Sequence, residues 1–240
     1  MAMVRFELQG STGVVTLDND KENRFHPDLV AQVLSTLDQA EKDKGIKALV
    51  FTGADPKFFC NGLDLPWLMA HATDMQSILA YLTQINAMYR RVCLFPKPIV
   101  GALNGHTFAG GAFLAAHMDF RFMRADKGWV CLPEVDINIP LLPGMVAIMQ
   151  AVTTPAGFRE MYYTGRRFTA QEAQAAGYVD RTFPAEELLP RSIDFAAELG
   201  AKRTRTYAEM KRRLRAHVVR VMDEEDAAAF LPTLALAMPG

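Results

Sequence analysis

The sequence lacks the long uninterrupted apolar run that a membrane-spanning helix needs. Its longest apolar stretch, residues 141–152, is interrupted by Pro143 and Gly144, and it is shorter than the roughly 20 residues that cross a bilayer. The first ten residues, MAMVRFELQG, place Arg5 and Glu7 within an expected strand, and they lack the apolar core of a signal peptide. We therefore expect a protein that is neither embedded in a membrane nor exported.

Cysteine is also scarce. The chain has three cysteines, Cys60, Cys93 and Cys131, which lie far apart and form no CxxC pair. An odd number of scattered cysteines indicates reduced thiols and not a disulfide framework. From this pattern we expect buried free thiols and a cytoplasmic location.

An excess of charge of one sign is missing. The chain has 26 Lys and Arg residues against 27 Asp and Glu residues, so it has no overall field that would attract nucleic acid. One local basic run, residues 211–215, contains no aromatic residue, and we expect it to be a solvated helix face. The alternative is that one of its charges meets a ligand that carries phosphate. No nucleic-acid partner is expected.

The signatures of several enzyme classes are absent. The five histidines show no HExxH or HxxxH spacing, so the sequence predicts no metal site. No GxSxG hydrolase motif is present, and no GxGxxG dinucleotide motif follows a strand. Gly105 and Gly110 have the spacing of a phosphate-binding loop, but Gly111 and Ala112 stand where that loop has Lys and then Ser or Thr. These four kinds of site are therefore not expected.

The sequence does contain an alternation of short strand-like and longer helix-like segments. Strands are expected at residues 14–17, 48–52, 98–103 and 120–123, and helices at residues 27–43 and 68–92. Such β-α-β alternation predicts an α/β fold. From Pro184 onward the pattern is only helical. We therefore expect a core of strands and helices over residues 1–190, and a helical region for packing or assembly over residues 191–240.

Two turns that contain glycine follow expected buried strands. They are FFCNGLDL at residues 58–65 and NGHTFAGGA at residues 104–112. Ligands of α/β folds bind at such strand ends. A helix that starts at Gly110 and Gly111 would also leave free N–H groups, which bind negative charge. The alternative is that these glycines only form tight turns.

Glu134 is the candidate acid or base. It lies between Pro133 and Val135 in a mostly apolar segment, residues 130–140. Burial of a carboxyl group raises its pKa, and a raised pKa would make Glu134 a usable base near neutral pH. The alternative is an exposed glutamate on a loop, and the same question applies to Asp136. For Asp119, just before a strand, we expect a structural hydrogen-bonding role.

Taken together, these segments resemble the crotonase (enoyl-CoA hydratase/isomerase) family over roughly residues 3–190. FFCNGLDL resembles the family's F-C/S-x-G-x-D-L/I segment, residues 104–115 its NGxxxGGG segment, Pro133-Glu134 the position of a catalytic Glu, and residues 163–180 its TGxxxxAxEAxxxGxVD segment. The resemblance implies a spiral of ββα units with a helical C-terminal region, assembled as a homotrimer or a dimer of trimers. It also implies an acyl-CoA substrate, with coenzyme A as part of the substrate and no separate cofactor.

The resemblance assigns roles to individual residues. The backbone N–H groups of Leu63 and Gly110 would form an oxyanion hole, and Glu134 would act as the acid and base. The residues implied in substrate binding are Asn23, Arg24, Phe25, Cys60, Gly62, Asp64, Leu65 and Phe113.

Phe113 marks a departure from part of the family. Family hydratases carry a second glutamate at this position, and hydration uses two carboxylates, whereas one carboxylate is suited to moving a proton between carbons. Residues 23–28 and 59–67 resemble most the Δ3,Δ2-enoyl-CoA isomerases of the family. We therefore predict that Glu134 moves a proton from C2 to C4 of a 3-enoyl-CoA. The alternatives are another crotonase-type reaction such as hydration, with Asp136 as a second acid, or an acyl-CoA-binding protein without activity.

Overall fold

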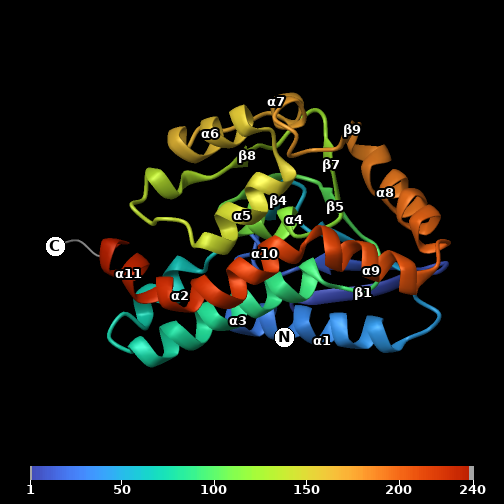
Figure 1. The fold of residues 1–240 in the computed structure, drawn as a ribbon. Coiled ribbons are helices and arrows are strands. Elements are labelled where there is room, and N and C mark those ends of the chain that lie inside the picture. The colour runs from blue at the N-terminus through green and yellow to red at the C-terminus, as the bar shows by residue number, and fades with distance from the viewer. Residues whose placement is uncertain (1, 238–240) are drawn as a thin grey trace.

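Six strands form the larger of two sheets in the computed structural model, which describes residues 2–237 (Figure 1). Their order is β1-β2-β3-β5-β7-β9, and all neighbours are parallel except the β1-β2 hairpin. The bounds are β1 Val4–Gln9, β2 Thr12–Leu17, β3 Ala48–Gly53, β5 Ile99–Leu103, β7 Phe120–Arg124 and β9 Arg181–Phe183. The predicted α/β class is therefore confirmed. β3 and β5 are almost entirely buried, as expected for parallel strands covered on both faces.

A second, smaller sheet was not predicted. Its parallel strands, in the order β4-β6-β8, are β4 Phe58–Cys60, β6 His106–Phe108 and β8 Val130–Cys131. Sequence periodicity cannot detect strands of two or three residues. Each strand runs directly into a predicted site segment, namely Gly62-Leu63 after β4, Gly110 after β6 and Glu134 after β8. Because the strands are parallel, these three segments meet at one edge of the sheet.

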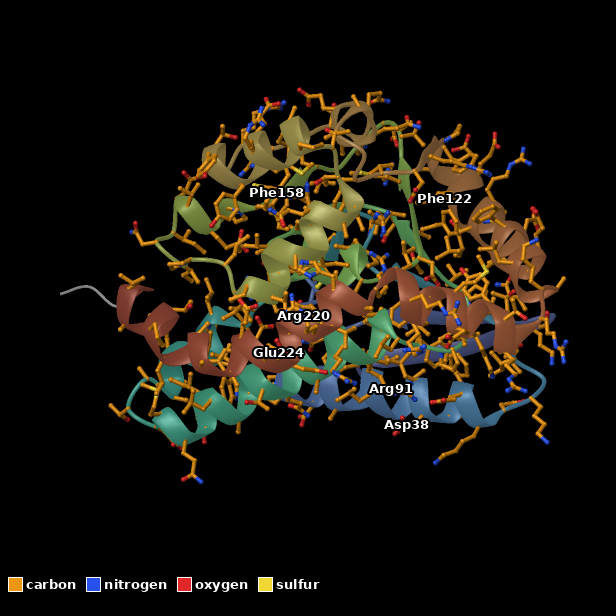
Figure 2. The ribbon with its side chains drawn as sticks, viewed as in Figure 1. Asp38, Arg91, Phe122, Phe158, Arg220 and Glu224 are labelled. Atoms are coloured by element: carbon orange, nitrogen blue, oxygen red, sulfur yellow. The ribbon has the colours of Figure 1, made fainter. Side chains whose placement is uncertain are left out.

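The predicted helix over residues 68–92 is in fact two helices, α2 Leu65–Ala70 and α3 Met75–Cys93. The break has a local cause, because Asp74 accepts a hydrogen bond from the Ser77 N–H and thereby caps the start of α3. α3 packs against α1 Pro27–Lys42. Figure 2 labels Arg91 of α3 and Asp38 of α1, whose side chains form an ion pair at 3.0 Å.

The middle of the chain adds short helices around the small sheet. They are α4 Gly110–Ala116, the 3-10 turn η1 Pro133–Val135, α5 Pro143–Val152, α6 Pro155–Thr164 and α7 Ala170–Ala175. Thr169 and Glu172 form a capping box at the start of α7. All three cysteines are buried and free.

The C-terminal part of the chain is helical, as predicted. It contains α8 Ala185–Gly200, α9 Thr204–Leu214, α10 Ala216–Val221, the π-helical turn η2 Met222–Asp226 and α11 Ala227–Ala237. The boundary expected after residue 190 falls inside α8. This helix packs on the large sheet in a small apolar cluster that includes Phe122, whereas Phe158 of α6 belongs to the main core (Figure 2).

The basic run at residues 211–215 is only partly solvated. Lys211 is buried and forms an ion pair with Asp119 at 2.6 Å, and Arg215 is also buried and donates to the Met118 carbonyl. The expectation of a solvated face is wrong for these two residues, because their side chains reach the segments that lead into β5 and β7, where Lys211 also donates to the Lys97 carbonyl. Asp119 accepts a hydrogen bond from the Ile99 N–H and has the expected structural role. Within residues 2–237, no helix is long and apolar enough to cross a bilayer.

Candidate active site

The turns after β4 and β6 are in direct contact at Gly62 and Gly110. Gly62 has a φ of +83°, and a Cβ atom added there would lie 2.4 Å from the Gly110 nitrogen. A Cβ atom added at Gly110 would lie 2.9 Å from the Gly62 Cα atom. Only glycine satisfies both the backbone conformation at position 62 and the close approach of the two turns. The N–H groups of Leu63 and Gly110 are thereby placed beside each other.

These two N–H groups have no acceptor within residues 2–237. Gly110 is the first residue of α4, where an N–H group has no partner within its own helix. Its carbonyl accepts a hydrogen bond of 2.9 Å from the Tyr89 hydroxyl of α3, which fixes the turn. On the other turn, the Phe25 N–H donates to the Gly62 carbonyl at 2.7 Å. Two anchored backbone donors are therefore available for a negatively charged oxygen.

The Glu134 carboxyl group, in the segment after the third strand, lies near the two N–H groups. Glu134 lies in the turn η1 just after β8, and its carbonyl accepts a hydrogen bond from the Ile139 N–H. Its Oε2 atom is buried and has no hydrogen-bond partner in the described chain. Burial raises the pKa of Glu134 to about 7, although its own backbone N–H partly offsets this shift. The alternative of an exposed loop glutamate is therefore wrong.

A cavity of about 140 Å³ joins the three segments. Leu63, Gly110 and Glu134 all line it. The rest of its wall comes mainly from apolar side chains of α2, α3, residues 137–145 and α11. One part of this mainly apolar cavity thus carries a carboxyl group and two free N–H donors. Such a site suits an apolar chain that ends in a group able to carry negative charge on oxygen.

Five of the residues predicted from the sequence line this cavity: Leu63, Leu65, Gly110, Phe113 and Glu134. Phe113 is 1% exposed and lies on α4, one turn after Gly110. Among the described residues, no group of three or more His, Cys, Asp or Glu side chains could hold a metal ion.

The other predicted substrate-binding residues do not line the cavity, and most of them contact the two turns or their flanking segments. The Asn23 side chain is buried and donates to the Phe59 carbonyl at 3.0 Å, and the Cys60 thiol donates to the Asn23 carbonyl at 3.0 Å. Burial raises the pKa of Cys60 to about 12, which makes it an unreactive thiol. Phe25 packs against Gly110, Arg24 pairs with Glu22 at 2.6 Å, and Asp64 caps α2. Their role in coenzyme A binding stays a prediction.

Sequence reasoning missed the residues that form the body of the cavity. Asn86 and Tyr89 come from α3, Met145 from α5, and Phe230 and Thr233 from α11. The helical periodicity of α3 indicates which side chains are buried, but it cannot indicate which buried side chains border a cavity. α11 is apolar on nearly all sides, so its pattern does not distinguish a buried face. Only contact between elements distant in the sequence gives this information.

The sequence comparisons give a matching family and similar proteins in a plant and a bacterium. A family model described as "Enoyl-CoA hydratase/isomerase" matches residues 7–230. Enoyl-CoA delta isomerase 2, peroxisomal, of Arabidopsis thaliana is 32% identical, and the match covers 97% of this chain and 100% of that protein. Carnitinyl-CoA dehydratase of Escherichia coli is 31% identical, with coverage of 79% of this chain and 71% of the relative.

The fold has counterparts among solved structures. The human mitochondrial Δ3-Δ2-enoyl-CoA isomerase superposes with a TM-score of 0.90, covering 98% of this chain and 92% of that chain. Its sequence is 20% identical, so this similarity supports the fold alone.

Proposed function

The chain belongs to the enoyl-CoA hydratase/isomerase family, and on this premise we propose that it is a Δ3,Δ2-enoyl-CoA isomerase with Glu134 as its acid and base. Family membership confirms the crotonase resemblance and the predicted fold class. The observation that carries the proposal is a single buried carboxyl group beside two free backbone donors in one apolar cavity.

The reaction needs one proton to move between two carbons. The Glu134 carboxylate takes a proton from C2 of a 3-enoyl-CoA, and the electron pair of that C–H bond delocalises into a dienolate. The negative charge falls on the thioester oxygen, where the N–H groups of Leu63 and Gly110 stabilise it. The same carboxyl then returns the proton to C4, and a double bond remains between C2 and C3. No atom is gained or lost.

The pKa of Glu134 suits both halves of this reaction. With a pKa of about 7, the group is substantially ionised near neutral pH and can accept a proton, yet it holds that proton weakly enough to return it. The two backbone donors act on the charge that develops in between, and removal of one such donor typically costs about 100- to 1000-fold in rate.

Phe113 supports isomerisation over hydration. Hydration requires a water molecule that is held and activated, and a second carboxylate commonly shares this task. In this chain the corresponding side chain is the buried ring of Phe113, which offers no hydrogen-bond acceptor and excludes water. The isomerase names of the Arabidopsis relatives agree with this choice.

The test compares two substrates for the purified protein. A 3-enoyl-CoA should gain the ultraviolet absorbance of a conjugated 2-enoyl thioester, and a 2-enoyl-CoA should keep its absorbance. Loss of absorbance from the 2-enoyl-CoA would instead identify a hydratase. Binding of both thioesters without any change in absorbance would indicate an acyl-CoA-binding protein without activity.

A homotrimeric or hexameric assembly and a cytoplasmic location are further proposals, based on the resemblance and on the free cysteines.

A further inference from the structure

The helices α10 and α11, with the turn η2 between them, extend along α3 and α5 (Figure 1). α11 then contributes Phe230 and Thr233 to the wall of the apolar cavity. Phe230 is only 6% exposed, although the neighbouring Leu231 is 54% exposed. The same helix therefore has one side chain in the cavity and the next one in solvent.

The turn η2 is attached to two different helices. Asp223 pairs with Arg90 of α3 through two hydrogen bonds of 2.6 and 2.9 Å. Asp226 accepts a hydrogen bond of 2.7 Å from the Gly144 N–H at the start of α5. Glu224 instead pairs with Arg220 on the outer face, where Figure 2 labels both residues. The wide π-helical turn lets acidic side chains close in sequence reach different neighbours.

The contact between Asp226 and α5 leaves no free space. Asp226 is 1% exposed. A Cβ atom on Gly144 would lie 2.5 Å from the Asp226 Oδ2 atom and 2.5 Å from the Met222 Cγ atom. The position of η2 is therefore fixed against the first turn of α5, the helix that carries Met145 in the cavity wall.

A series of contacts connects the Gly110 turn to the C-terminal helix. The Tyr89 hydroxyl contacts Gly110, and Asn86 lies one helical turn before Tyr89 on α3. The Asn86 side chain is close enough to the Asp226 carboxyl to favour its charged form. Phe230 follows one turn after Asp226. Phe230 is thus separated from the backbone donors by a turn of α3 and a turn of the C-terminal helix.

We propose that Phe230 closes the end of the cavity away from Gly110 and so limits the length of the acyl chain, and that Asp226 is the positioning residue that holds Phe230 there. This inference rests on the proposed function, because it takes the cavity to hold the acyl group of a thioester. It assigns the site to acyl chains of limited length. Wild-type affinity should rise with chain length and then fall for chains that reach Phe230.

The test measures binding of saturated acyl-CoA thioesters, which do not react. Hexanoyl-, decanoyl- and tetradecanoyl-CoA are titrated calorimetrically into wild type, Phe230→Ala and Leu231→Ala. Each further methylene that becomes buried adds about fourfold in affinity, so Phe230→Ala should improve tetradecanoyl-CoA binding relative to hexanoyl-CoA by at least about tenfold. The exposed neighbour Leu231→Ala should keep the wild-type preference. Equal affinity of wild type for all three lengths, or an unchanged preference in Phe230→Ala, would overturn the proposal.

The role of Asp226 is tested with a conservative pair of variants. Asp226→Asn keeps an oxygen for the Gly144 N–H and should retain the wild-type preference, whereas Asp226→Ala should move it toward longer chains. With 3-enoyl-CoA substrates, Asp226→Ala should raise KM several-fold with little change in kcat. A large fall in kcat with unchanged KM and unchanged length preference would contradict a positioning role. If Phe230→Ala does not fold, Phe230→Leu gives a smaller opening at the same position. Binding of the unreactive thioesters needs no turnover. An inactive wild type would therefore refute the proposed isomerase activity but not the proposed limit on chain length.

Discussion

Glu134 and Asp226 are two buried carboxyl groups near one cavity, but their surroundings differ. Both lie in short irregular helical turns, η1 and η2, and burial raises the pKa of both. Asp226 receives the Gly144 N–H on one oxygen. Glu134 receives no hydrogen bond from another residue of the described chain, and it lines the cavity beside Leu63 and Gly110.

If Glu134 is the reactive group, as proposed, this difference means that burial alone does not identify a reactive carboxyl group. A buried carboxylate with a backbone donor can serve as a fixed link between two helices, as Asp226 does. A buried carboxyl without such a donor is costly to the fold, and the cost is understandable where the group must exchange a proton with a ligand. Four predictions test this distinction.

The largest expected effect is on catalysis by Glu134. Glu134→Gln keeps the shape of the side chain but removes the base, so the isomerisation rate should fall by about 1000-fold. The conversion of a 3-enoyl-CoA is followed by ultraviolet absorbance. Asp136→Asn, an exposed carboxyl two residues away, should stay within a few-fold of wild type. A comparable loss in Asp136→Asn would favour a mechanism with two acids, and a nearly unchanged rate in Glu134→Gln would remove this residue from the reaction.

The next effect concerns the backbone donors opposite Glu134. Gly62→Ala forces a Cβ atom against the Gly110 nitrogen and displaces at least one donor, so kcat should fall by about 100-fold. Gly10→Ala is the matched control, because Gly10 has a φ of +60° with nothing within 4 Å of the added atom. Both variants share the backbone strain, but only Gly62→Ala should lose activity. Equal losses in the two variants would indicate a general effect on stability.

A smaller effect is the dependence of stability on pH. The folded protein holds the Glu134 proton up to a pKa of about 7, whereas the ordinary value is 4.5. The stabilisation from the protonated group is therefore complete below the ordinary pKa and is lost as pH rises to about 7. Relative to Glu134→Gln, wild type should lose on the order of 2 to 3 kcal/mol of unfolding free energy across this range. Denaturant unfolding of both proteins at several pH values measures the difference, and parallel curves would refute the raised pKa.

The smallest effect belongs to Asp226. Asp226→Ala leaves the buried Gly144 N–H without a partner and should lower the free energy of unfolding by about 1 to 2 kcal/mol. Asp226→Asn keeps an acceptor and should lose less. Thermal or denaturant unfolding of the two variants measures the effect. If the alanine variant were as stable as wild type, the proposed link between η2 and α5 would be wrong.

Much of the reactive part of the site could be predicted because short segments encode it. Gly62, Gly110 and Glu134 each follow a strand, and their order along the chain matches a family pattern that specifies backbone positions. The three strands themselves were missed, since two or three residues carry no periodicity. Asn23 and Cys60 stand within the matched segments, yet the structure shows their side chains engaged in holding the turns.

The apolar part of the cavity could not be predicted, and the reason is physical. Tyr89 and Phe230 occupy ordinary buried positions of helices and Met145 a half-buried one, so hydrophobic patterning gives them the same signal as any core residue. The link between Gly144 and Asp226 depends on contact between helices that are far apart in the sequence. The break between α2 and α3, by contrast, follows from the capping residue Asp74, which is a local signal present in the sequence itself.

The double attachment of η2 also has a consequence for the folding reaction. Its two links join residues separated by 133 and 82 positions in the chain. Contacts between such distant residues carry a large loop-closure cost, and they commonly form after local structure. We expect the helices and strands to appear early in refolding and the capacity to bind a long apolar ligand to appear in the last phase. A bound acyl-CoA would then chiefly lower the rate of unfolding.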